Sequence, residues 1–181
     1  MSEESNASSA ELTMRPIGYI DSPYTRAQHT PEQTLRNPRA RGRVVLHKRY
    51  AAGLADLAGF DHAWLITWLH QAAPVPADLR VVPLLMRHDT RRIGVFATRY
   101  PSRPNPLGLH LIQVLEISGS VVEFAGVDMV HGTPVLDLKP WAQRFDIPGY
   151  RPGDNPELDE IRSGWYEQVL ANDQSGRSPS P

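Results

Sequence analysis

The sequence predicts a mainly β fold, a small single-domain and mostly antiparallel barrel with a short helix and a C-terminal helix. Apolar segments of strand length follow one another without the alternating helices of a doubly wound sheet. Ser118-Gly119-Ser120 separates two of these segments and is a good hairpin signal. Residues 61–70 (DHAWLITWLH) are apolar on both faces, which predicts a barrel wall buried on both sides.

The first third of the chain predicts two strands, a long loop and a helical turn. Residues 15–21 and 42–47 contain the branched apolar residues of strands. Residues 24–41, between them, have no sustained period and form a long loop, a kind of segment that is often functional. Residues 50–60 predict a short amphipathic helical turn ended by Gly59. Its inward-facing residues are expected to be Leu54, Leu57 and Phe60.

The middle of the chain predicts short strands and then a stiff loop. Residues 79–86 read as a strand in which Pro83 marks an edge or a bulge, and residues 95–97 read as a short apolar strand. Three prolines within the next nine residues each fix their own φ and disfavour helix before them, which predicts a rigid extended loop. That loop presents Arg99, Arg103 and Asn105, which suits anion or nucleotide recognition, although an ordinary surface connection with solvated arginines explains it equally well.

The last part of the chain predicts a hairpin, one more strand and a helix. Residues 109–117 and 121–127 form the hairpin, and residues 131–141 (HGTPVLDLKPW) contain a turn and a short strand. In the first hairpin strand, alternation places four residues on one face, namely Leu109, Leu111, Leu115 and Ile117. Asn155 caps a helix that begins at Pro156. Its apolar stripe is Leu158, Ile161, Trp165 and Val169.

These elements divide the chain into four parts. Residues 1–13 are acidic and rich in serine, lack the pattern of a signal peptide, and read as a disordered leader. Residues 14–150 form the barrel domain, and residues 151–170 form a linker and the C-terminal helix. Residues 171–181 read as a disordered tail.

Composition excludes several classes of function. Cysteine is absent, which excludes disulfides and thiolate chemistry and fits a cytoplasmic protein. No run approaches the roughly 20 apolar residues of a membrane helix. The seven histidines form no helical pair, so no metal site is expected, and neither the dinucleotide-binding nor the P-loop fingerprint occurs.

Charge is distributed unevenly along the chain. Residues 14–104 contain 14 Lys and Arg against 6 Asp and Glu, whereas residues 105–181 contain 5 against 11. A basic segment followed by an acidic one is typical of a protein that binds a polyanion with one face. The same charge distribution would result if the basic and acidic segments paired with each other within the protein. The residues that remain as candidates for chemistry are His70, Asp128, Asp137, Lys139 and the Arg99–Arg103–Asn105 loop, and for each acid a turn cap or a salt bridge is an equal alternative.

Three motifs resemble one known family. Residues 96–108 (FATRYPSRPNPLG), 132–141 (GTPVLDLKPW) and 53–66 (GLADLAGFDHAWLI) look like the TsaA/YaeB family, and the likeness runs in the family's order from about residue 17 to residue 147. This family is the β-barrel class of tRNA methyltransferases that use S-adenosyl-L-methionine. The resemblance implies a small barrel that forms a homodimer and binds S-adenosyl-L-methionine near the subunit junction.

The resemblance also implies a reaction and a cofactor site. The reaction is methyl transfer to the exocyclic nitrogen of threonylcarbamoyl-adenosine at position 37 of tRNA. By motif position, the residues that line the cofactor site are Gln33, His70, Gln71, Arg99, Leu109, Ala125, Gly126, Val127 and Asp128.

Substrate and proton-transfer roles follow from the same reading. A carbamoylated amine is a poor nucleophile, so a group that takes its proton would help, and the catalytic candidates are Asp128 and Asp137. Asp128 could instead orient the cofactor. The residues expected to hold RNA phosphate are Arg36, Arg39, Arg41, Arg91 and Arg92. Further signature positions assigned to the substrate are Arg103, Asn105 and Lys139.

The chain departs from the family pattern at several positions. Glu32 stands where the family commonly has arginine, His131 where it has aspartate, and Trp141 where it has tyrosine. Longer members have a domain after the barrel, where this chain shows only the helix over 158–169. Two alternatives therefore stay open, a methyltransferase that acts on a small molecule and a non-catalytic barrel that binds RNA or a protein.

Overall fold

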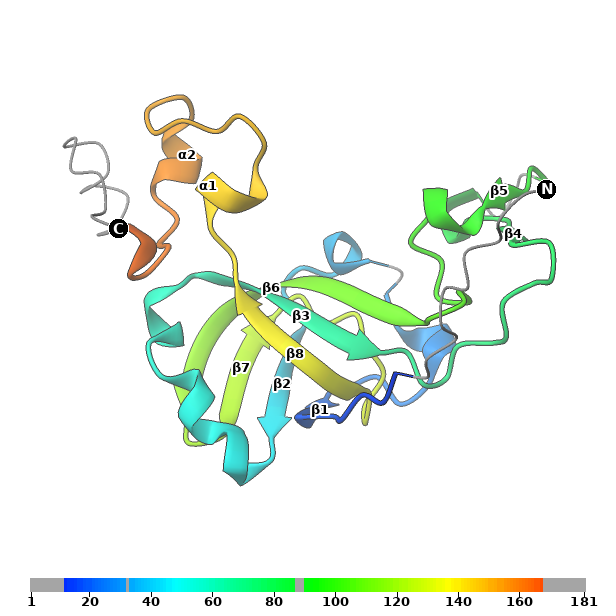
Figure 1. The fold of residues 1–181 in the computed structure, drawn as a ribbon, viewed down its shortest axis with the longest axis horizontal. Helices are drawn as coiled ribbons and strands as arrows, with labels where there is room; N and C mark the ends of the chain where they lie inside the picture. Colours follow the sequence, from blue (N-terminus) through cyan, green and yellow to red (C-terminus); the bar gives the residue numbers. More distant parts are fainter. Residues whose placement is uncertain (1–11, 32, 87–89, 168–181) are drawn as a thin grey trace, which may run out of the picture.

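Six strands close into a barrel at the centre of the protein (Figure 1). The computed structural model describes residues 12–31, 33–86 and 90–167. The strand order around the barrel is β1-β2-β7-β6-β3-β8, and every neighbouring pair is antiparallel, which confirms the predicted fold class. The barrel strands are β1 (Gly18–Asp21), β2 (Arg41–Leu46), β3 (His62–Trp68), β6 (Leu107–Ser118), β7 (Val121–Ala125) and β8 (Pro134–Pro140).

The core lies inside the barrel and under one group of short helices. Side chains alternate across each strand, so every second residue points inward. The fully buried apolar residues of the strands are Ile20, Val44, Ala63, Leu65, Ile112, Val122, Phe124 and Val135. The predicted helical turn over 50–60 is two 3₁₀ helices, Lys48–Leu54 and Leu57–Gly59, because Asp56 between them has a φ of 64°. Its inward residues are buried as predicted, namely Leu54, Leu57 and Phe60.

The strand β3 has one buried face and one outer face, so the prediction of two buried faces is wrong. Thr67 points inward and is fully buried, whereas Trp68 on the outer face is exposed. Trp64, also outside, is half-buried, and its Nε1 donates a hydrogen bond to Asp146 Oδ1 at 2.7 Å. Asp146 belongs to helix α1 (Gln143–Asp146), so the segment after β8 covers only part of this wall.

The strand β6 changes face along its length. Its register against β7 shifts between Val114 and Glu116, which is a β-bulge. Before the bulge Leu109 lies outside and is 54% exposed, whereas after it Ile117 packs against the core. The prediction that these two residues share a face is wrong, because the extra residue of a bulge reverses the alternation.

A small lobe extends from the barrel and is drawn in green on the right of Figure 1. It contains a two-stranded pairing of β4 (Arg80–Val81) with β5 (Ile93–Gly94). The predicted strand over 79–86 is reduced to β4, since Pro83 has no N–H to extend the ladder, and Leu84–Met86 form a 3₁₀ helix.

The segment that enters the proline-rich loop is helical rather than extended. Val95–Ala97 form a 3₁₀ helix, not the predicted strand. Val95 is buried and anchors this turn, while Phe96 is 74% exposed. Residues 98–106 then contain neither helix nor strand, as predicted for the loop.

The C-terminal segment, residues 141–167, folds back onto the barrel. Helix α2 (Pro156–Asp159) begins where predicted, and Asn155 Oδ1 accepts from the N–H groups of Glu157 and Leu158. The predicted longer helix is wrong, because Ser163 instead pairs with Phe60 in a β-bridge and Gly164 has a φ of 58°. Val169, the last residue of the predicted stripe, lies outside the described residues.

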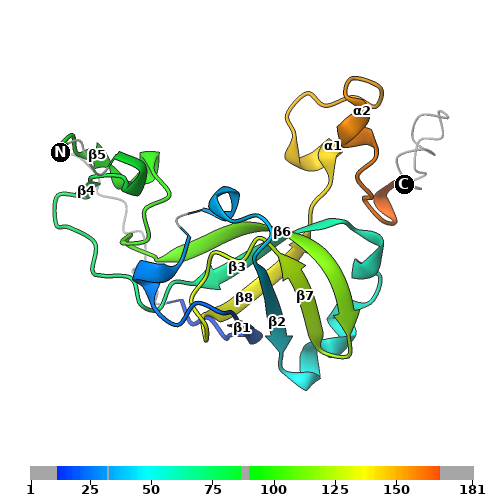
Figure 2. The ribbon, with the colours of Figure 1, turned by 180° about the vertical axis from the view of Figure 1, so that it is seen from behind.

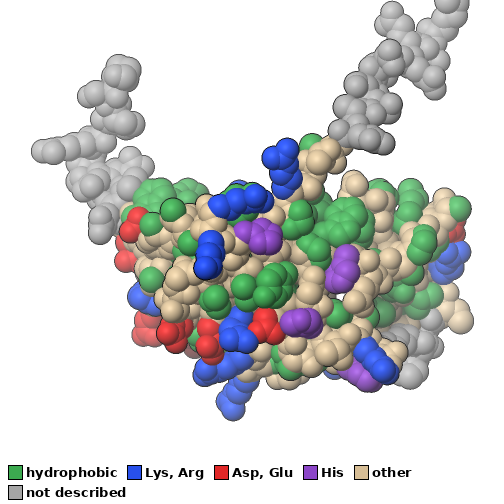
Figure 3. All heavy atoms as spheres, turned by 90° about the horizontal axis from the view of Figure 1, so that it is seen from below, with side chains coloured by type: hydrophobic (Ala, Val, Ile, Leu, Met, Phe, Trp, Pro, Cys, Tyr) green, Lys and Arg blue, Asp and Glu red, His purple; other side chains and the backbone are tan. Residues whose placement is uncertain are grey.

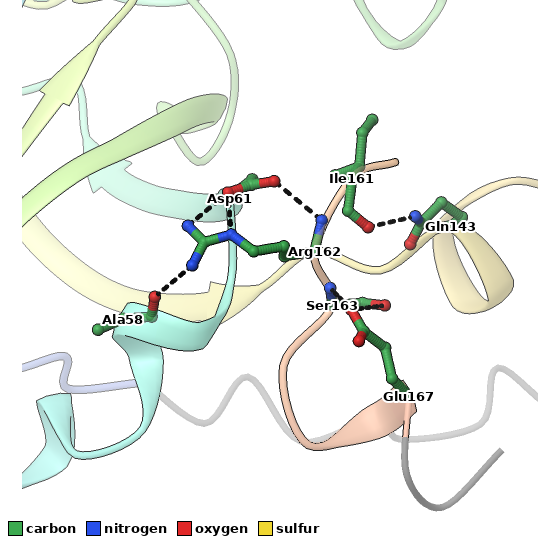
Figure 4. A network of polar contacts seen from close by, with 7 residues as sticks. All are labelled: Ala58, Asp61, Gln143, Ile161, Arg162, Ser163 and Glu167. Carbon is green, nitrogen blue, oxygen red and sulfur yellow. Dashed lines mark hydrogen bonds and ion pairs between the residues drawn. The ribbon is translucent and has the colours of Figure 1, made fainter. Parts of the chain in front are cut away.

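Arg162 docks this segment on the turn before β3, as Figure 4 shows. Its Nε and backbone N–H donate to the two carboxylate oxygens of Asp61 at 2.7 and 2.8 Å. Gln143 Nε2 donates to the carbonyl oxygens of Leu158 and Ile161, which closes the segment on itself. None of the helices in the described part of the chain has the length and hydropathy needed to cross a membrane.

We expect the Asp61–Arg162 contact to weaken in acid. Burial raises the pKa of Asp61, but the hydrogen bonds and charge of Arg162 outweigh it, so the pKa is lowered from 3.8. A lowered folded-state pKa means that the stabilisation is complete above about pH 3.8 and is lost as the pH falls through the lower folded-state value. Asp61→Asn should therefore show at pH 7 the lowered amide protection factors of residues 160–167, corrected for the intrinsic exchange rate, that the wild-type protein shows only in acid. Equal exchange in both proteins at pH 7 would contradict this.

Candidate functional site

One end of the barrel brings together four segments that are distant in sequence, and we call it the barrel mouth. The segments are the end of β3, the start of β6, residues 125–128 from the last residue of β7 onward, and residues 24–41, the loop that leads into the first residue of β2. Thr67 lies opposite Gly108 where β3 meets β6. In Figures 1 and 2 the two short blue helices of the loop, Ala27–His29 and Thr34–Arg36, lie beside the N-terminal half of β6.

Four side chains form a chain of hydrogen bonds across the barrel mouth, and we call them the mouth network. His110 Nδ1 lies 2.7 Å from Asp128 Oδ1, and these side chains are only 10% and 9% exposed. The hydroxyl of Thr67 lies 3.0 Å from His110 Nε2. Thr34 Oγ1 lies 3.2 Å from Asp128 Oδ2 and also 3.2 Å from the carbonyl oxygen of Gly126. The network thus runs Thr34–Asp128–His110–Thr67.

Two glycines leave the space that the mouth network occupies. A Cβ at Gly108 would overlap two side-chain atoms of the network. Gly126 has a φ of 89°, and a Cβ there would lie 2.5 Å from Thr34 Cγ2. The Gly126 N–H donates to the carbonyl oxygen of Ala40 at 2.8 Å, which holds residues 125–128 against the 24–41 loop.

The mouth network has the chemistry of a proton acceptor held in one orientation. A carboxylate opposite Nδ1 keeps the proton on that nitrogen and leaves His110 Nε2 to accept from the Thr67 hydroxyl. A carboxylate offers about four acceptor sites, and Asp128 uses two of them. Its remaining lone pairs can accept a proton from a bound substrate.

The structure places most of the predicted cofactor residues on the four segments of the mouth. Gln33 directly precedes Thr34 and is half-buried. His70 and Gln71 lie in the turn after β3, exposed, with their side-chain nitrogens 3.4 Å apart. Three further predicted cofactor residues directly precede Asp128 and are buried, namely Ala125, Gly126 and Val127.

Two predicted cofactor residues lie apart from the network. Leu109 is next to His110 in β6, but its side chain is on the outer face of the barrel. Arg99 is exposed on the proline-rich loop, and no hydrogen bond or ion pair joins its guanidinium to another described residue. The loop itself reaches the mouth, since Leu69 N–H donates to the Pro106 carbonyl oxygen at 2.8 Å.

The structure separates the two carboxylates predicted to be catalytic. Asp137 lies on the outer face of β8, opposite Ile66 of β3. Its Oδ2 is 2.9 Å from Lys139 Nζ, and this hydrogen bond raises the pKa of Lys139. Asp128 alone of the two lies in the barrel mouth, and Asp137 and Lys139 form an ion pair outside it.

The predicted substrate-binding residues differ in their partners. Arg36, Arg39 and Asn105 are exposed, and their side chains make no hydrogen bond or ion pair within the described part of the chain. Arg41 pairs with Glu123 at 2.8 Å, and Arg92 makes two hydrogen bonds to Asp78 at 2.7 and 2.9 Å. Arg91 is exposed and also has an interaction partner.

Arg103 braces the proline-rich loop from within. Its guanidinium donates to the Thr98 carbonyl oxygen at 2.8 Å and lies 3.3 and 3.4 Å from the carbonyl oxygens of Val95 and Tyr100. These three bonds close the loop on itself, and Arg103 is directed toward the loop's own backbone.

Reasoning from sequence missed three residues of the mouth network, Thr34, Thr67 and His110. One signal could have found His110, because Gly108, His110 and Ile112 alternate on the face of β6 opposite Leu109. That alternation places an imidazole inside the barrel, where it requires a polar partner.

One pocket on the outer surface lies beside two ion pairs. This pocket lies beside β1 and β2 and is lined by two ion pairs, Arg41 with Glu123 and Arg43 with Asp21. Within each pair the carboxylate neutralises the charge of the arginine. Figure 3 shows histidine and basic side chains spread over one face, with acidic side chains gathered toward one side of it. In the ranges that the structure describes, no three His, Asp or Glu residues are grouped to hold a metal ion.

Comparison with known proteins gives the family. Residues 19–147 match the family model described as the tRNA-methyltransferase O N-terminal domain. The chain belongs to this family. The matched region begins one residue into β1 and includes the rest of the barrel and all four residues of the mouth network.

Named relatives agree with the family model. The chain is 34% identical to a probable S-adenosyl-L-methionine-binding protein of Pyrococcus abyssi, over 87% of this chain and 77% of that one. It is 33% identical to the human tRNA (adenine(37)-N6)-methyltransferase, over 76% of this chain and 32% of that one. A crystal structure of TrmO from Pseudomonas aeruginosa superposes with a TM-score of 0.63 at 30% identity, over 82% of this chain and 63% of that one. The chain thus spans a third of the human relative and under two thirds of the solved TrmO chain.

Proposed function

We propose that the protein is an S-adenosyl-L-methionine-dependent tRNA methyltransferase that modifies the exocyclic nitrogen of threonylcarbamoyl-adenosine at position 37. The observation that supports this best is the nearly buried Asp128–His110 pair, which lies among the segments that contain most of the proposed cofactor residues. Membership of the TrmO family and the named activities of its relatives point the same way.

The residues of the mouth, together with Arg99 on the adjoining proline-rich loop, fit this cofactor by the chemistry of their side chains. The guanidinium of Arg99 would hold a carboxylate, and the amides of Gln33 and Gln71 would hold hydroxyl groups. When bound, S-adenosyl-L-methionine supplies a methyl group on a positively charged sulfur, which keeps the electron pair of the broken carbon–sulfur bond.

Asp128 has the role of proton acceptor in this proposal. The substrate nitrogen gains a methyl group and must lose a proton, and Asp128 takes that proton on a carboxylate oxygen. A positioned acid–base group of this kind contributes about 100- to 10,000-fold to a rate. Asp137 stays a second candidate, and from the outer face of β8 it could act only in a site that includes that face.

The tRNA is proposed to approach the mouth through the 24–41 loop. Arg36 and Arg39 are exposed there without described partners, so they are available for phosphate. The proposed substrate residues Arg41, Arg91, Arg92 and Lys139 would exchange their present partners for phosphate, and Arg103 would act by shaping the loop.

We also propose a homodimer located in the cytoplasm. Trp68 of β3 and Leu107 of β6 lie opposite each other, and both are exposed on the outer wall beside Leu109. An exposed apolar strip of this kind is typical of a protein–protein interface. A second subunit on this strip would bring the outward Leu109, and with it Asp137, next to a subunit junction.

The deciding experiment uses labelled cofactor and tRNA that has the threonylcarbamoyl group but lacks the methyl group. We expect label in the modified nucleoside at position 37 after digestion. Label in a small molecule but not in tRNA would favour a small-molecule methyltransferase. Absence of cofactor binding in calorimetry would favour a non-catalytic barrel.

Salt dependence tests the proposed RNA contacts. Each phosphate contact contributes a slope of about −0.7 to −0.9 in a plot of log affinity against log salt concentration. We expect Arg36→Ala and Arg39→Ala each to reduce the slope for tRNA binding by about 1. Lys48→Ala is the matched control, because Lys48 is also exposed but follows the opposite end of β2. A slope unchanged by both arginine variants would contradict the proposed tRNA path.

A further inference from the structure

The mouth network joins all four segments of the barrel mouth by side-chain hydrogen bonds. Thr34 is next to Gln33 in the 24–41 loop, and Asp128 ends the 125–128 segment. His110 is on β6, and Thr67 is on β3, three residues before His70. Each bond of the network therefore connects one proposed cofactor segment with the next.

We infer that His110 is a positioning residue that holds Asp128 and the cofactor segments in place by donating from Nδ1 to Asp128 and accepting from Thr67 at Nε2. This inference rests on the proposed function for the identity of the cofactor. His110 is central because it is the member that links the β3 side of the mouth to the Asp128 side.

The surroundings of His110 argue against direct contact with a substrate. Its Nε2, the nitrogen that would otherwise act as a base, faces the hydroxyl of Thr67, and Thr67 has no exposed surface. The order Thr67–His110–Asp128 resembles that of a nucleophile, base and acid, but a hydroxyl without access to solvent or substrate cannot attack one. His110 thus acts through Asp128.

The Nδ1 bond is the stronger of the two, because it joins a donor to a charged acceptor at 2.7 Å. Removing this buried bond leaves Asp128 Oδ1 without its imidazole partner. Asp128 would then keep only its contact with Thr34. The 125–128 segment would lose its side-chain link to β6, although the backbone pairing of Ala125 with Gln113 would stay.

Two amide variants separate positioning from simple filling of space. An asparagine at this position places its amide nitrogen where Nδ1 was, so His110→Asn keeps the bond to Asp128. A glutamine is larger but places its amide nearer the Nε2 position, so His110→Gln keeps only the Thr67 contact. We expect His110→Leu and His110→Gln to raise the Kd for S-adenosyl-L-methionine about 10- to 100-fold, and His110→Asn to stay within about threefold of wild type.

The measurements are calorimetric titration of each variant with S-adenosyl-L-methionine and ¹⁵N NMR of the imidazole in the wild-type protein without cofactor. The inference is supported if the wild-type protein binds the cofactor most tightly, His110→Asn next, and His110→Gln and His110→Leu most weakly. It also requires the Nδ1–H tautomer of His110. A Gln variant that binds better than the Asn variant would overturn the inference, since a space-filling side chain would then suffice. An Nε2–H tautomer would also overturn it. Failure of the wild-type protein to bind the cofactor would instead overturn the proposed function, and the tautomer would still test the Asp128 bond.

Discussion

Asp128→Asn is expected to reduce kcat for tRNA methylation by about 100- to 10,000-fold while leaving the fold intact. The substitution keeps the shape of the side chain and removes its charge. The amide oxygen of the substituted side chain can still accept from His110, and its NH₂ group can donate to the Thr34 hydroxyl, so the network stays bonded. An amide cannot take a proton from the substrate nitrogen. The measurement is a single-turnover methylation rate, with circular dichroism to verify the fold.

The matched control for Asp128 is Asp56→Asn. Asp56 is exposed between two 3₁₀ helices with a φ of 64°, a conformation that asparagine also tolerates, and its side chain has no described partner. This control should methylate tRNA at the wild-type rate. A rate for Asp128→Asn within a factor of a few of wild type would show that Asp128 is not the proton acceptor. The same measurement on Asp137→Asn would then test the second candidate.

Gly126→Ala is expected to destabilise the protein and to weaken cofactor binding together. At a φ of 89° a Cβ costs about 1–3 kcal/mol in backbone strain. The new Cβ would also lie 2.5 Å from Thr34 Cγ2, and such overpacking costs about 1–3 kcal/mol more. A turn of the Thr34 side chain that relieves this contact also moves its hydroxyl away from Asp128. Urea unfolding and calorimetric titration with S-adenosyl-L-methionine measure the two effects.

Two further variants separate strain from the lost contact. Gly132 has a φ of 80° and nothing within 4 Å of its added Cβ, so Gly132→Ala should show the strain alone and normal cofactor affinity. Thr34→Ser in the Gly126→Ala background removes the clashing Cγ2 and keeps the hydroxyl, so it should restore much of the affinity. Equal affinity in Gly126→Ala and Gly132→Ala would mean that Thr34 has no part in holding the site.

Local patterns were enough to predict much of the fold. The hairpin at residues 118–120 forms because Gly119 supplies a φ of 60°, and α2 begins where Asn155 caps it. Both features depend on residues a few positions apart. The predictions were wrong where pairing with another strand decides the structure. The face of each residue in β6, for example, depends on a bulge that forms where β6 pairs with β7.

The candidate site was also predicted only in part from the sequence. The motifs of the sequence located Asp128 and most of the segments around the barrel mouth, because those residues belong to contiguous stretches. Only the tertiary structure showed that Asp128 contacts His110, 18 residues away, and Thr34, 94 residues away, and that Thr67 reaches His110 across 43 residues. It also placed Asp137 on the outer wall. Neither fact follows from spacing, because closure of the barrel, the bulge in β6 and the left-handed turn at Gly126 together decide which side chains meet.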